Sequence, residues 1–469
     1  GNTGVGTGVF GALTTGDNNV AVGLNALDVN TTGSENVAVG MGALDTNTTG
    51  AGNISIGCGS MSANVSGNYN VAIGRCALDT SVSGSANVAI GDRALYTNTA
   101  SYNTSVGFFS LAANTTGASN VAVGTNVLSV NTSASNNTAV GKDSLKANTT
   151  GADSTAVGFE AMFTNTTGCR NTAFGKRALK LNTVGCDNVG IGLNSLCANT
   201  TGDFNTGIGF ASLQSNTTAD NNTGLGYYAL QANTTASNNT AVGCGAGAAN
   251  TTGVSNTAVG HAALNDNTTA SNNTAIGMNS LAVTTTGCQN TAVGAGAMDT
   301  NSTGDNNVAV GFSALDANTT ADKNTAVGHS ALKANTTGTR NTAVGFCSLT
   351  TNTTGDDNTA FGTESLRANT TGANNVAVGK NALVANTTGD ENTAVGCNTL
   401  GANTTADNNT AIGAFALDTN TEGHSNVAVG RSALTANTTA DNNTAVGFDS
   451  MKANTTGSEN TALGISSSY

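Results

Sequence analysis

The sequence predicts an all-β fold, a parallel β-solenoid (β-roll) in which each repeat of the chain forms one coil. Three observations lead to this prediction. A five-residue phrase that ends in glycine, such as Asn324-Thr325-Ala326-Val327-Gly328, occurs 28 times, almost always 17 residues apart. Apolar residues recur at fixed places in this period, and charged residues keep to other places. A period this short and regular is typical of one structural unit per repeat, stacked along an axis.

The repeat runs through the whole chain, so we expect residues 1–469 to form a single continuous solenoid domain of 28 coils. One coil, 92–107, has 16 residues, and the terminal coil, 460–469, is incomplete. Repeat positions are numbered here so that Asn324 is position 1 and Gly328 is position 5 of 17. The sequence begins at Gly1 rather than Met, from which we expect processing or truncation upstream.

The apolar pattern predicts two strands in each coil, one at positions 1–5 and one at positions 8–11. Position 4 is Val, Ile, Leu or Phe in all 28 repeats, and position 9 is Leu, Met or Phe in 26 of them. Alternate side chains of a strand face opposite sides. We therefore expect positions 4 and 9 to form two apolar columns that bury each other. The expected core residues include Val327, Leu332, Val344, Leu349, Phe174 and Phe361.

Position 1 is asparagine in 27 of the 28 repeats. A stacked side-chain amide can donate a hydrogen bond to one neighbouring coil and accept one from the other, which forms a ladder. The expected ladder includes Asn307, Asn324, Asn341 and Asn358. Glycine at position 5 predicts a corner with positive φ or a close backbone approach. The Asn-Thr-Thr-Gly segment at positions 12–15 predicts a surface turn.

Charged residues predict which positions face water. Of the 43 charged side chains, 41 lie at positions 6, 7, 10, 16 and 17, and burial of unpaired charge is costly. Position 3 is only Ala, Ser or Gly, although its place in the strand points away from the expected core. We therefore expect an inter-chain face at Ala309, Ala326 and Ala343 in a parallel homo-oligomer, most simply a homotrimer. The alternative is a narrow monomeric coil with position 3 turned inward.

The nine cysteines form no Cys-x-x-Cys pair, so a zinc site is not expected. Cys169 and Cys186 share position 16 in consecutive coils. Neighbouring strands lie about 4.8 Å apart, within the Cα separation of about 4.4–6.8 Å that a disulfide spans. A disulfide and two unpaired surface thiols both stay open as interpretations.

The composition argues against several classes of function. A net charge of −13 disfavours nucleic acid and anionic membrane surfaces as partners, and no apolar run is long enough to insert into a membrane. The three histidines, His261, His329 and His424, are scattered singly. We therefore expect no enzymatic activity, no metal and no cofactor.

The phrases Asn-Val-Ala-Val-Gly at 36–40 and Asn-Val-Ala-Ile-Gly at 70–74 and 87–91 resemble the head repeats of YadA-like trimeric autotransporter adhesins. The longer period resembles repeats in tail fibres of aquatic phages and fibres of large algal viruses. This resemblance covers essentially the whole chain. It implies a left-handed parallel β-roll that assembles as a homotrimer, and it says little about the biological role because one fold serves many surfaces.

Together these features predict an extracellular fibrous structural protein of a cell surface or virion surface, which forms a rigid rod or an end-to-end filament. The variable aromatic residues Phe108, Phe109, Tyr227 and Tyr228 are candidate contacts for a cell-surface or glycan ligand. The alternative function is an adhesin head or a viral tail-fibre receptor-binding protein. An ice-binding solenoid is a remote alternative, because the paired threonines at positions 13 and 14 cannot share one flat strand face.

Overall fold

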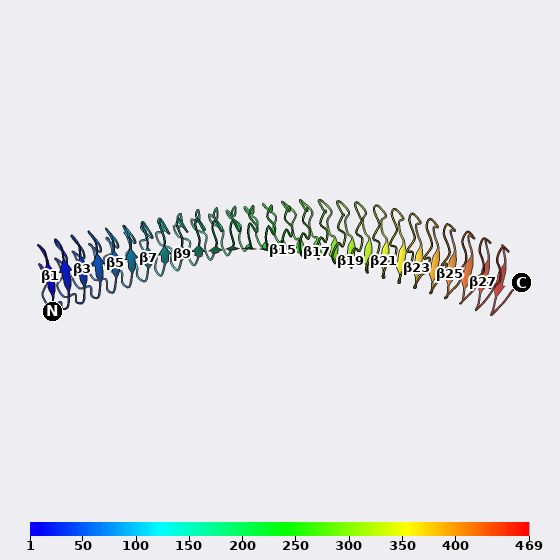
Figure 1. Ribbon diagram of the computed structural model, residues 1–469, viewed down its shortest axis with the longest axis horizontal. Coiled ribbons are helices and arrows are strands. Elements are labelled where there is room, and N and C mark those ends of the chain that lie inside the picture. Colours follow the sequence, from blue (N-terminus) through cyan, green and yellow to red (C-terminus); the bar gives the residue numbers. More distant parts are fainter. Residues whose placement is uncertain (469) are drawn as a thin grey trace. The chain divides into compact units, whose positions relative to one another are not determined.

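The predicted fold class is confirmed: the computed structural model is a parallel β-solenoid with a 17-residue period (Figure 1). It describes residues 1–468, which contain strands and turns but no helix. Each coil has one three-residue strand, at positions 2–4 of the repeat. The first fourteen strands are β1 (Thr3–Val5), β2 (Val20–Val22), β3 (Val37–Val39), β4 (Ile54–Ile56), β5 (Val71–Ile73), β6 (Val88–Ile90), β7 (Thr104–Val106), β8 (Val121–Val123), β9 (Thr138–Val140), β10 (Thr155–Val157), β11 (Thr172–Phe174), β12 (Val189–Ile191), β13 (Thr206–Ile208) and β14 (Thr223–Leu225). The others are β15 (Thr240–Val242), β16 (Thr257–Val259), β17 (Thr274–Ile276), β18 (Thr291–Val293), β19 (Val308–Val310), β20 (Thr325–Val327), β21 (Thr342–Val344), β22 (Thr359–Phe361), β23 (Val376–Val378), β24 (Thr393–Val395), β25 (Thr410–Ile412), β26 (Val427–Val429), β27 (Thr444–Val446) and β28 (Thr461–Leu463).

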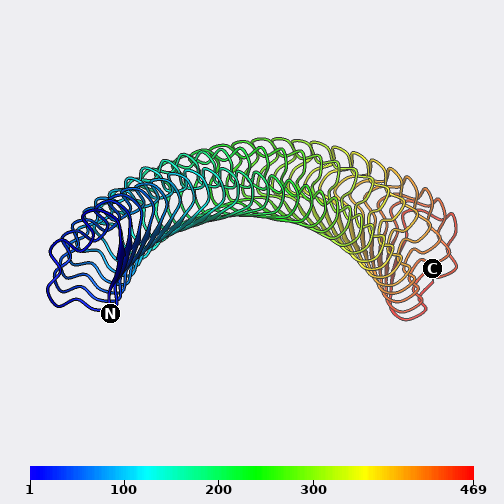
Figure 2. The same ribbon diagram turned by 60° about the vertical axis from the view of Figure 1, so that its left-hand side comes forward.

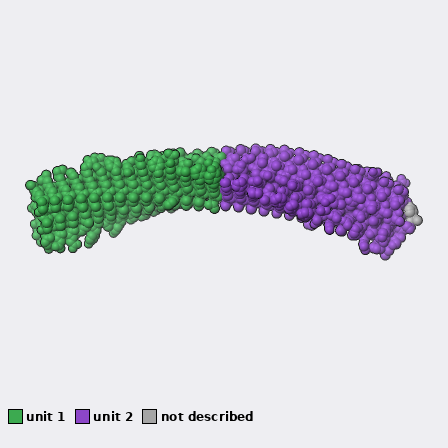
Figure 3. Space-filling model, in the orientation of Figure 1, with its two compact units in different colours: residues 1–237 green, residues 238–469 purple. Residues whose placement is uncertain are grey.

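The chain divides into two compact units (Figure 3). Unit 1 is Gly1–Ser237 with strands β1–β14, and unit 2 is Asn238–Tyr469 with strands β15–β28. Both units are built from the same coil. The continuity of residues 1–469 as a single domain stays a prediction.

Within each unit, every strand pairs in parallel with the strand of the next coil, so successive coils lie side by side (Figures 1 and 2). The register keeps each repeat position next to its counterpart. In unit 2, for example, Thr325 pairs with Thr342 and Val327 pairs with Val344. Equal repeat positions therefore form columns along each unit, as the period predicts.

Within residues 1–468, no second strand forms at positions 8–11, so that prediction is wrong. These residues form turns, and the leucine at position 9 has a positive φ, 53° at Leu332 and 50° at Leu349. A left-handed residue interrupts an extended strand. Neighbouring coils are still joined here, because the Leu332 N–H donates to the Ser348 carbonyl oxygen at 3.0 Å.

The orientation predicted for the strand at positions 2–4 is also wrong. Position 3 faces the interior, and Ala309, Ala326 and Ala343 are fully buried in their own coils, so they form no inter-chain face. The predicted core residues at position 4 face outward instead. Val327 and Val344 are only partly buried, and Phe174 and Phe361 are 56% and 55% exposed. Leu332 and Leu349 are fully buried, as expected.

The narrow interior of the coil explains this inversion. A Cβ atom added at Gly207, which occupies position 3, would lie 2.7 Å from Ser195 Oγ and 3.1 Å from Leu196 Cγ, at positions 8 and 9 of the preceding coil. The strand therefore lies against positions 8 and 9 with room for little more than a methyl group. Leucine from position 9 fills the interior, and the bulkier side chains of position 4 fit only outside, because close-packed interiors do not tolerate extra volume.

The asparagine ladder at position 1 is present and buried. The Asn324 N–H donates to Asn307 Oδ1 at 2.9 Å, and Asn324 Oδ1 in turn accepts from the Asn341 N–H at 2.9 Å. Asn358 continues the series through its N–H, which donates to Asn341 Oδ1 at 3.0 Å. The Asn324 amide Nδ2 donates to the Gly338 carbonyl oxygen at 2.9 Å. The ladder thus satisfies backbone groups that the corner would otherwise bury without partners.

A second ladder runs through the asparagines at position 12, and its interruptions show what it contributes. Asn335 Nδ2 donates to Asn318 Oδ1 at 3.2 Å. Where Ser81 or Thr284 replaces asparagine, the hydroxyl oxygens of these residues and Oδ1 of Asn64 and Asn267 in the preceding coils are buried without a hydrogen-bond partner. The amide is therefore the group that reaches from one coil to the next at this corner.

Candidate functional site

The side chains at positions 2 and 4 form an outer sheet face on each unit. Position 2 supplies threonine, valine or, once, isoleucine (Ile54), and position 4 supplies valine, isoleucine, leucine or phenylalanine. The exposed position-4 residues are Val5, Val22, Ile56, Ile73, Ile90, Phe174 and Leu225 in unit 1, and Ile276, Val310, Phe361, Val378, Ile412 and Leu463 in unit 2. A contiguous apolar strip of this kind is typical of an interaction surface.

The four predicted aromatic contacts lie in two clusters of unit 1. The ring centroids of Phe108 and Phe109 are 4.6 Å apart. Tyr227 and Tyr228 are 4.0 Å apart, and Tyr227 stacks on Phe210 at 5.3 Å. Phe108 and Tyr227 are about half exposed. The rings of the second cluster therefore pack mainly on one another.

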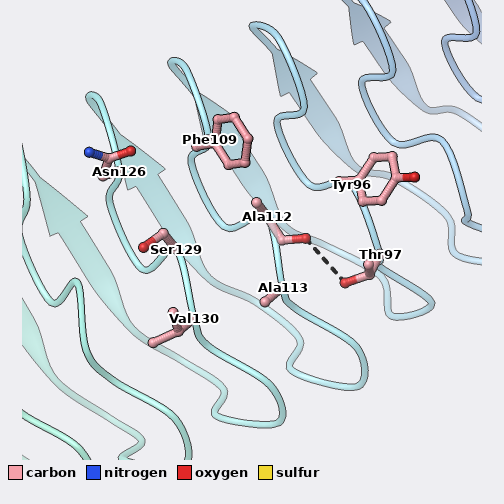
Figure 4. Close-up of a pocket in the computed structure, with 8 residues that line it drawn as sticks. All are labelled: Tyr96, Thr97, Phe109, Ala112, Ala113, Asn126, Ser129 and Val130. Carbon is pink, nitrogen blue, oxygen red and sulfur yellow. Dashed lines mark hydrogen bonds between the residues drawn. The ribbon is translucent and has the colours of Figure 1, made fainter.

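A surface hollow of about 430 Å³ lies beside the first cluster (Figure 4). It spans three consecutive coils of unit 1, and the first of these is the 16-residue coil 92–107. It is lined by Tyr96, Thr97, Phe109, Ala112, Ala113, Asn126, Ser129 and Val130. The hollow exists because small residues, Ala112 and Ser129, follow Tyr96 in the position-10 column.

Contacts around the hollow hold its lining side chains in place. The Arg93 guanidinium lies 5.2 Å from the Phe109 ring centroid, a cation–π contact. Asn126 Nδ2 donates to Asp143 Oδ1 at 3.2 Å, and Figure 4 shows the Asn126 oxygen on the side of Phe109. Thr97 Oγ1 donates to the Ala112 carbonyl oxygen at 3.1 Å. The lining itself carries no charged group.

Ion pairs link equal positions of neighbouring coils on the exposed side. Arg170 Nε lies 2.7 Å from Asp187 Oδ1, and Arg340 Nε lies 2.7 Å from Asp357 Oδ1. The hydrogen bond from the partner arginine lowers the pKa of both aspartates. Exposed pairs of this kind contribute little to stability, because water and salt screen the charges. We infer that they align neighbouring coils rather than form a reactive site.

Cys169 and Cys186 are adjacent free thiols with their Sγ atoms 2.7 Å apart. Their hydrogen bond is the main reason that the pKa of the Cys169 thiol is raised to about 11. The thiolate is the nucleophile in disulfide formation, so Cys169 is a weak nucleophile at neutral pH. Consecutive coils nevertheless bring these two sulfur atoms together, as the shared repeat position predicts.

Metal-binding clusters and membrane-spanning helices are two further kinds of site to consider. Among residues 1–468, no group of three or more His, Cys, Asp or Glu side chains is arranged to hold a metal ion. A search of the same residues finds no helix with the length and apolar character to span a membrane.

Comparison with known proteins assigns no family. No protein-family model matches the sequence, and a search of curated proteins finds no match. The features on which a function can be based are therefore the outer sheet face and the hollow. Phe109 was expected from the sequence, but Tyr96, Asn126 and Ser129 were not. The signal that could have identified them is the 16-residue interval immediately before the Phe108–Phe109 pair.

Proposed function

We propose that this protein is an extracellular structural fibre subunit that associates with copies of itself through the outer sheet face. The observation that supports this proposal most strongly is the strip of exposed valine, isoleucine, leucine and phenylalanine side chains at position 4 of each unit. Removal of such a strip from water favours association. The regular columns also let two copies meet with the same contact repeated in many coils.

The resemblance to YadA-like head repeats and viral fibre repeats supports a homotrimer on a cell surface or virion surface as the assembled form. The face proposed here differs from the alanine strip expected from the sequence, since the alanines are buried within each coil. Stacking of trimers end to end would extend the fibre. The net charge of −13 favours a role without nucleic acid.

Two phenylalanines in neighbouring coils of unit 2 test the proposed interface. Phe361 lies on the outer sheet face, whereas Phe346, at position 6, is similarly exposed but lies outside that face. Phe361→Asp is expected to raise the dissociation constant of the oligomer at least about tenfold, because burial of a phenylalanine contributes about 1.5–3 kcal/mol. The mass and its concentration dependence are measured by analytical ultracentrifugation.

Phe346→Asp is the matched control and should leave the dissociation constant unchanged. Circular dichroism and thermal unfolding check that both variants keep the solenoid fold. A wild-type chain that stays monomeric at all concentrations, or equal weakening by both variants, would refute the proposed interface.

Ice binding is a second candidate function. One observation supports it on the outer sheet face rather than on the paired threonines at positions 13 and 14. In strands that read Thr-Ala-Val, threonine at position 2 and valine at position 4 point outward. Where neighbouring strands share this sequence, the parallel register places like residues side by side, as for Thr325 with Thr342 and Val327 with Val344. In such coils the strand presents hydroxyl and methyl groups on one face, unlike the adjacent threonines at positions 13 and 14. Thermal hysteresis shown by a monomeric chain would favour this function over self-association.

A further inference from the structure

We propose that the hollow between Tyr96, Phe109 and Asn126 is a binding site for a neutral saccharide. This inference deepens the proposed surface function by giving the fibre a ligand class, and it concerns a different surface from the association face. The hollow has a volume of about 430 Å³, which falls within the range of about 300–1,000 Å³ that is typical of small-molecule sites.

The position of the hollow in the repeat sets it apart from the rest of the chain. Tyr96 and Thr97 belong to coil 92–107, which is the only coil of 16 residues in the sequence. The missing residue falls in the turn at 98–101, where Asn103 Nδ2 donates directly to Asn98 Oδ1 at 3.2 Å and joins the two asparagine ladders. The local sequence therefore departs from the repeat in the same coils that form the hollow.

The lining has the chemistry that recognises a sugar ring. Tyr96 and Phe109 are half-buried aromatic side chains on either side of the small residue Ala112 (Figure 4). An aromatic face carries partial negative charge and packs well against the positively polarised C–H groups on one face of a pyranose ring. The aromatic walls therefore supply the apolar part of saccharide recognition.

The polar groups of the lining are uncharged, which favours a neutral ligand. Asn126 holds its Nδ2 against Asp143, and its oxygen lies on the side of Phe109, where it can accept a hydrogen bond from a sugar hydroxyl. Ser129 Oγ donates to the Lys146 carbonyl oxygen at 3.5 Å and can accept a second hydrogen bond, whereas the Tyr96 hydroxyl points away from Phe109 (Figure 4). No lysine or arginine lines the hollow to pair with a carboxylate, sulfate or phosphate.

The site is also preorganised. Outside the hollow, the Phe108 ring centroid lies 4.6 Å and the Arg93 guanidinium 5.2 Å from the Phe109 ring centroid. Asp143 orients Asn126 by accepting a hydrogen bond from its Nδ2. Asp143 is itself paired with Lys146 at 3.2 Å. Side chains that are already ordered lose less freedom when a ligand binds. By contrast, the rings of Phe210, Tyr227 and Tyr228 pack on one another, so we do not assign a site there.

The test uses the full chain on an array of neutral oligosaccharides of glucose, galactose, mannose and N-acetylglucosamine, with sialylated and sulfated glycans and unrelated peptides beside them. The tightest neutral saccharide is then titrated by calorimetry. Tyr96→Ala and Phe109→Asn are expected to weaken its binding at least tenfold. Both variants should fold, since Ala112 and Asn126 occupy the same repeat positions in the next coil.

Tyr227→Ala, in the other aromatic cluster, is the matched control and should leave saccharide binding unchanged. Lack of binding to every neutral saccharide, preference for acidic glycans or peptides, or unchanged affinity in both hollow variants would overturn the inference. The sedimentation mass of Tyr96→Ala should equal that of the wild type, because Tyr96 lies outside the association face. Saccharide affinity and oligomer mass therefore test the hollow and the association face separately.

Discussion

Replacement of Ala326 by lysine is expected to unfold the coils around β20, whereas replacement of the next residue, Val327, is expected to leave them folded. Ala326 is fully buried in a narrow interior, and Val327 lies on the outer sheet face. A long, charged side chain at position 3 would need both space and a partner that the coil lacks, at a cost of more than about 4 kcal/mol. Val327→Lys should cost about 1 kcal/mol or less.

Chemical denaturation and hydrogen exchange of β19–β21 measure this difference. Ala326→Gly is a matched control, because glycine already occupies position 3 at Gly190, Gly207 and Gly224. This control should cost about 1 kcal/mol, the usual difference between the two residues. Equal losses for the two lysine variants, or a larger loss for Val327→Lys, would show that the strand faces the other way.

Gly328→Ala is expected to cost about 3 kcal/mol or more, and Gly338→Ala about 1 kcal/mol or less. An added Cβ at either glycine would lie 2.4 Å from a carbonyl oxygen of the next coil, Gly345 or Gly355. The two sites differ in backbone conformation, because only Gly328 has a positive φ, 135°, in a region that is essentially restricted to glycine. The backbone conformation of each glycine, rather than the close contact of the added Cβ with a carbonyl oxygen, should therefore determine how much each substitution destabilises the fold.

The chain itself provides the control for this comparison. Position 15, where Gly338 lies, is alanine at Ala321 and Ala406, whereas position 5 is glycine in every repeat. The coils therefore adjust to a methyl group at position 15. Denaturant unfolding of the two variants measures the difference, and equal destabilisation would show that the close carbonyl contact, not φ, requires glycine.

The sequence alone was sufficient to predict the features that depend on periodicity. The 17-residue period places equal positions in one column, so it predicts the parallel register, the buried Leu332 column and the ladder through Asn324. It also brings Cys169 and Cys186 together. Charge identifies further exposed positions, because a lysine or aspartate has a clear preference for water. It does not identify positions 2 and 4, which are at least partly exposed but carry no charged residue.

The orientation of the strand could not be predicted in the same way, because the hydrophobicity and the volume of the side chains at positions 3 and 4 favour opposite orientations. Val327 is more apolar than Ala326, so the pattern favoured burial of position 4. The narrow interior of the coil accommodates the small residue at position 3 and not the larger one at position 4. The width of this interior depends on the turn at positions 8–11, where Leu332 adopts a left-handed conformation. A bulky leucine at positive φ is uncommon, so the sequence pattern predicts a second strand rather than this turn.

The candidate site was only partly predictable for a different reason. Phe109 stood out as an aromatic residue at a variable position, but Tyr96 and Ser129 are ordinary substitutions at position 10 when the sequence is read along the chain. They form a lining only because coils stack, so that residues one repeat apart become neighbours. A search for departures from the repeat across adjacent coils would have brought these residues together.

An experimental density map that resolves side chains would show which face of the strand lies inside the coil. We expect one three-residue strand in each 17-residue coil, with density for alanine inside the coil and for valine or phenylalanine at position 4 outside it, whether or not other chains cover that face. A map with Val327 and Phe361 enclosed by their own coils, and Ala326 outside, would contradict this expectation.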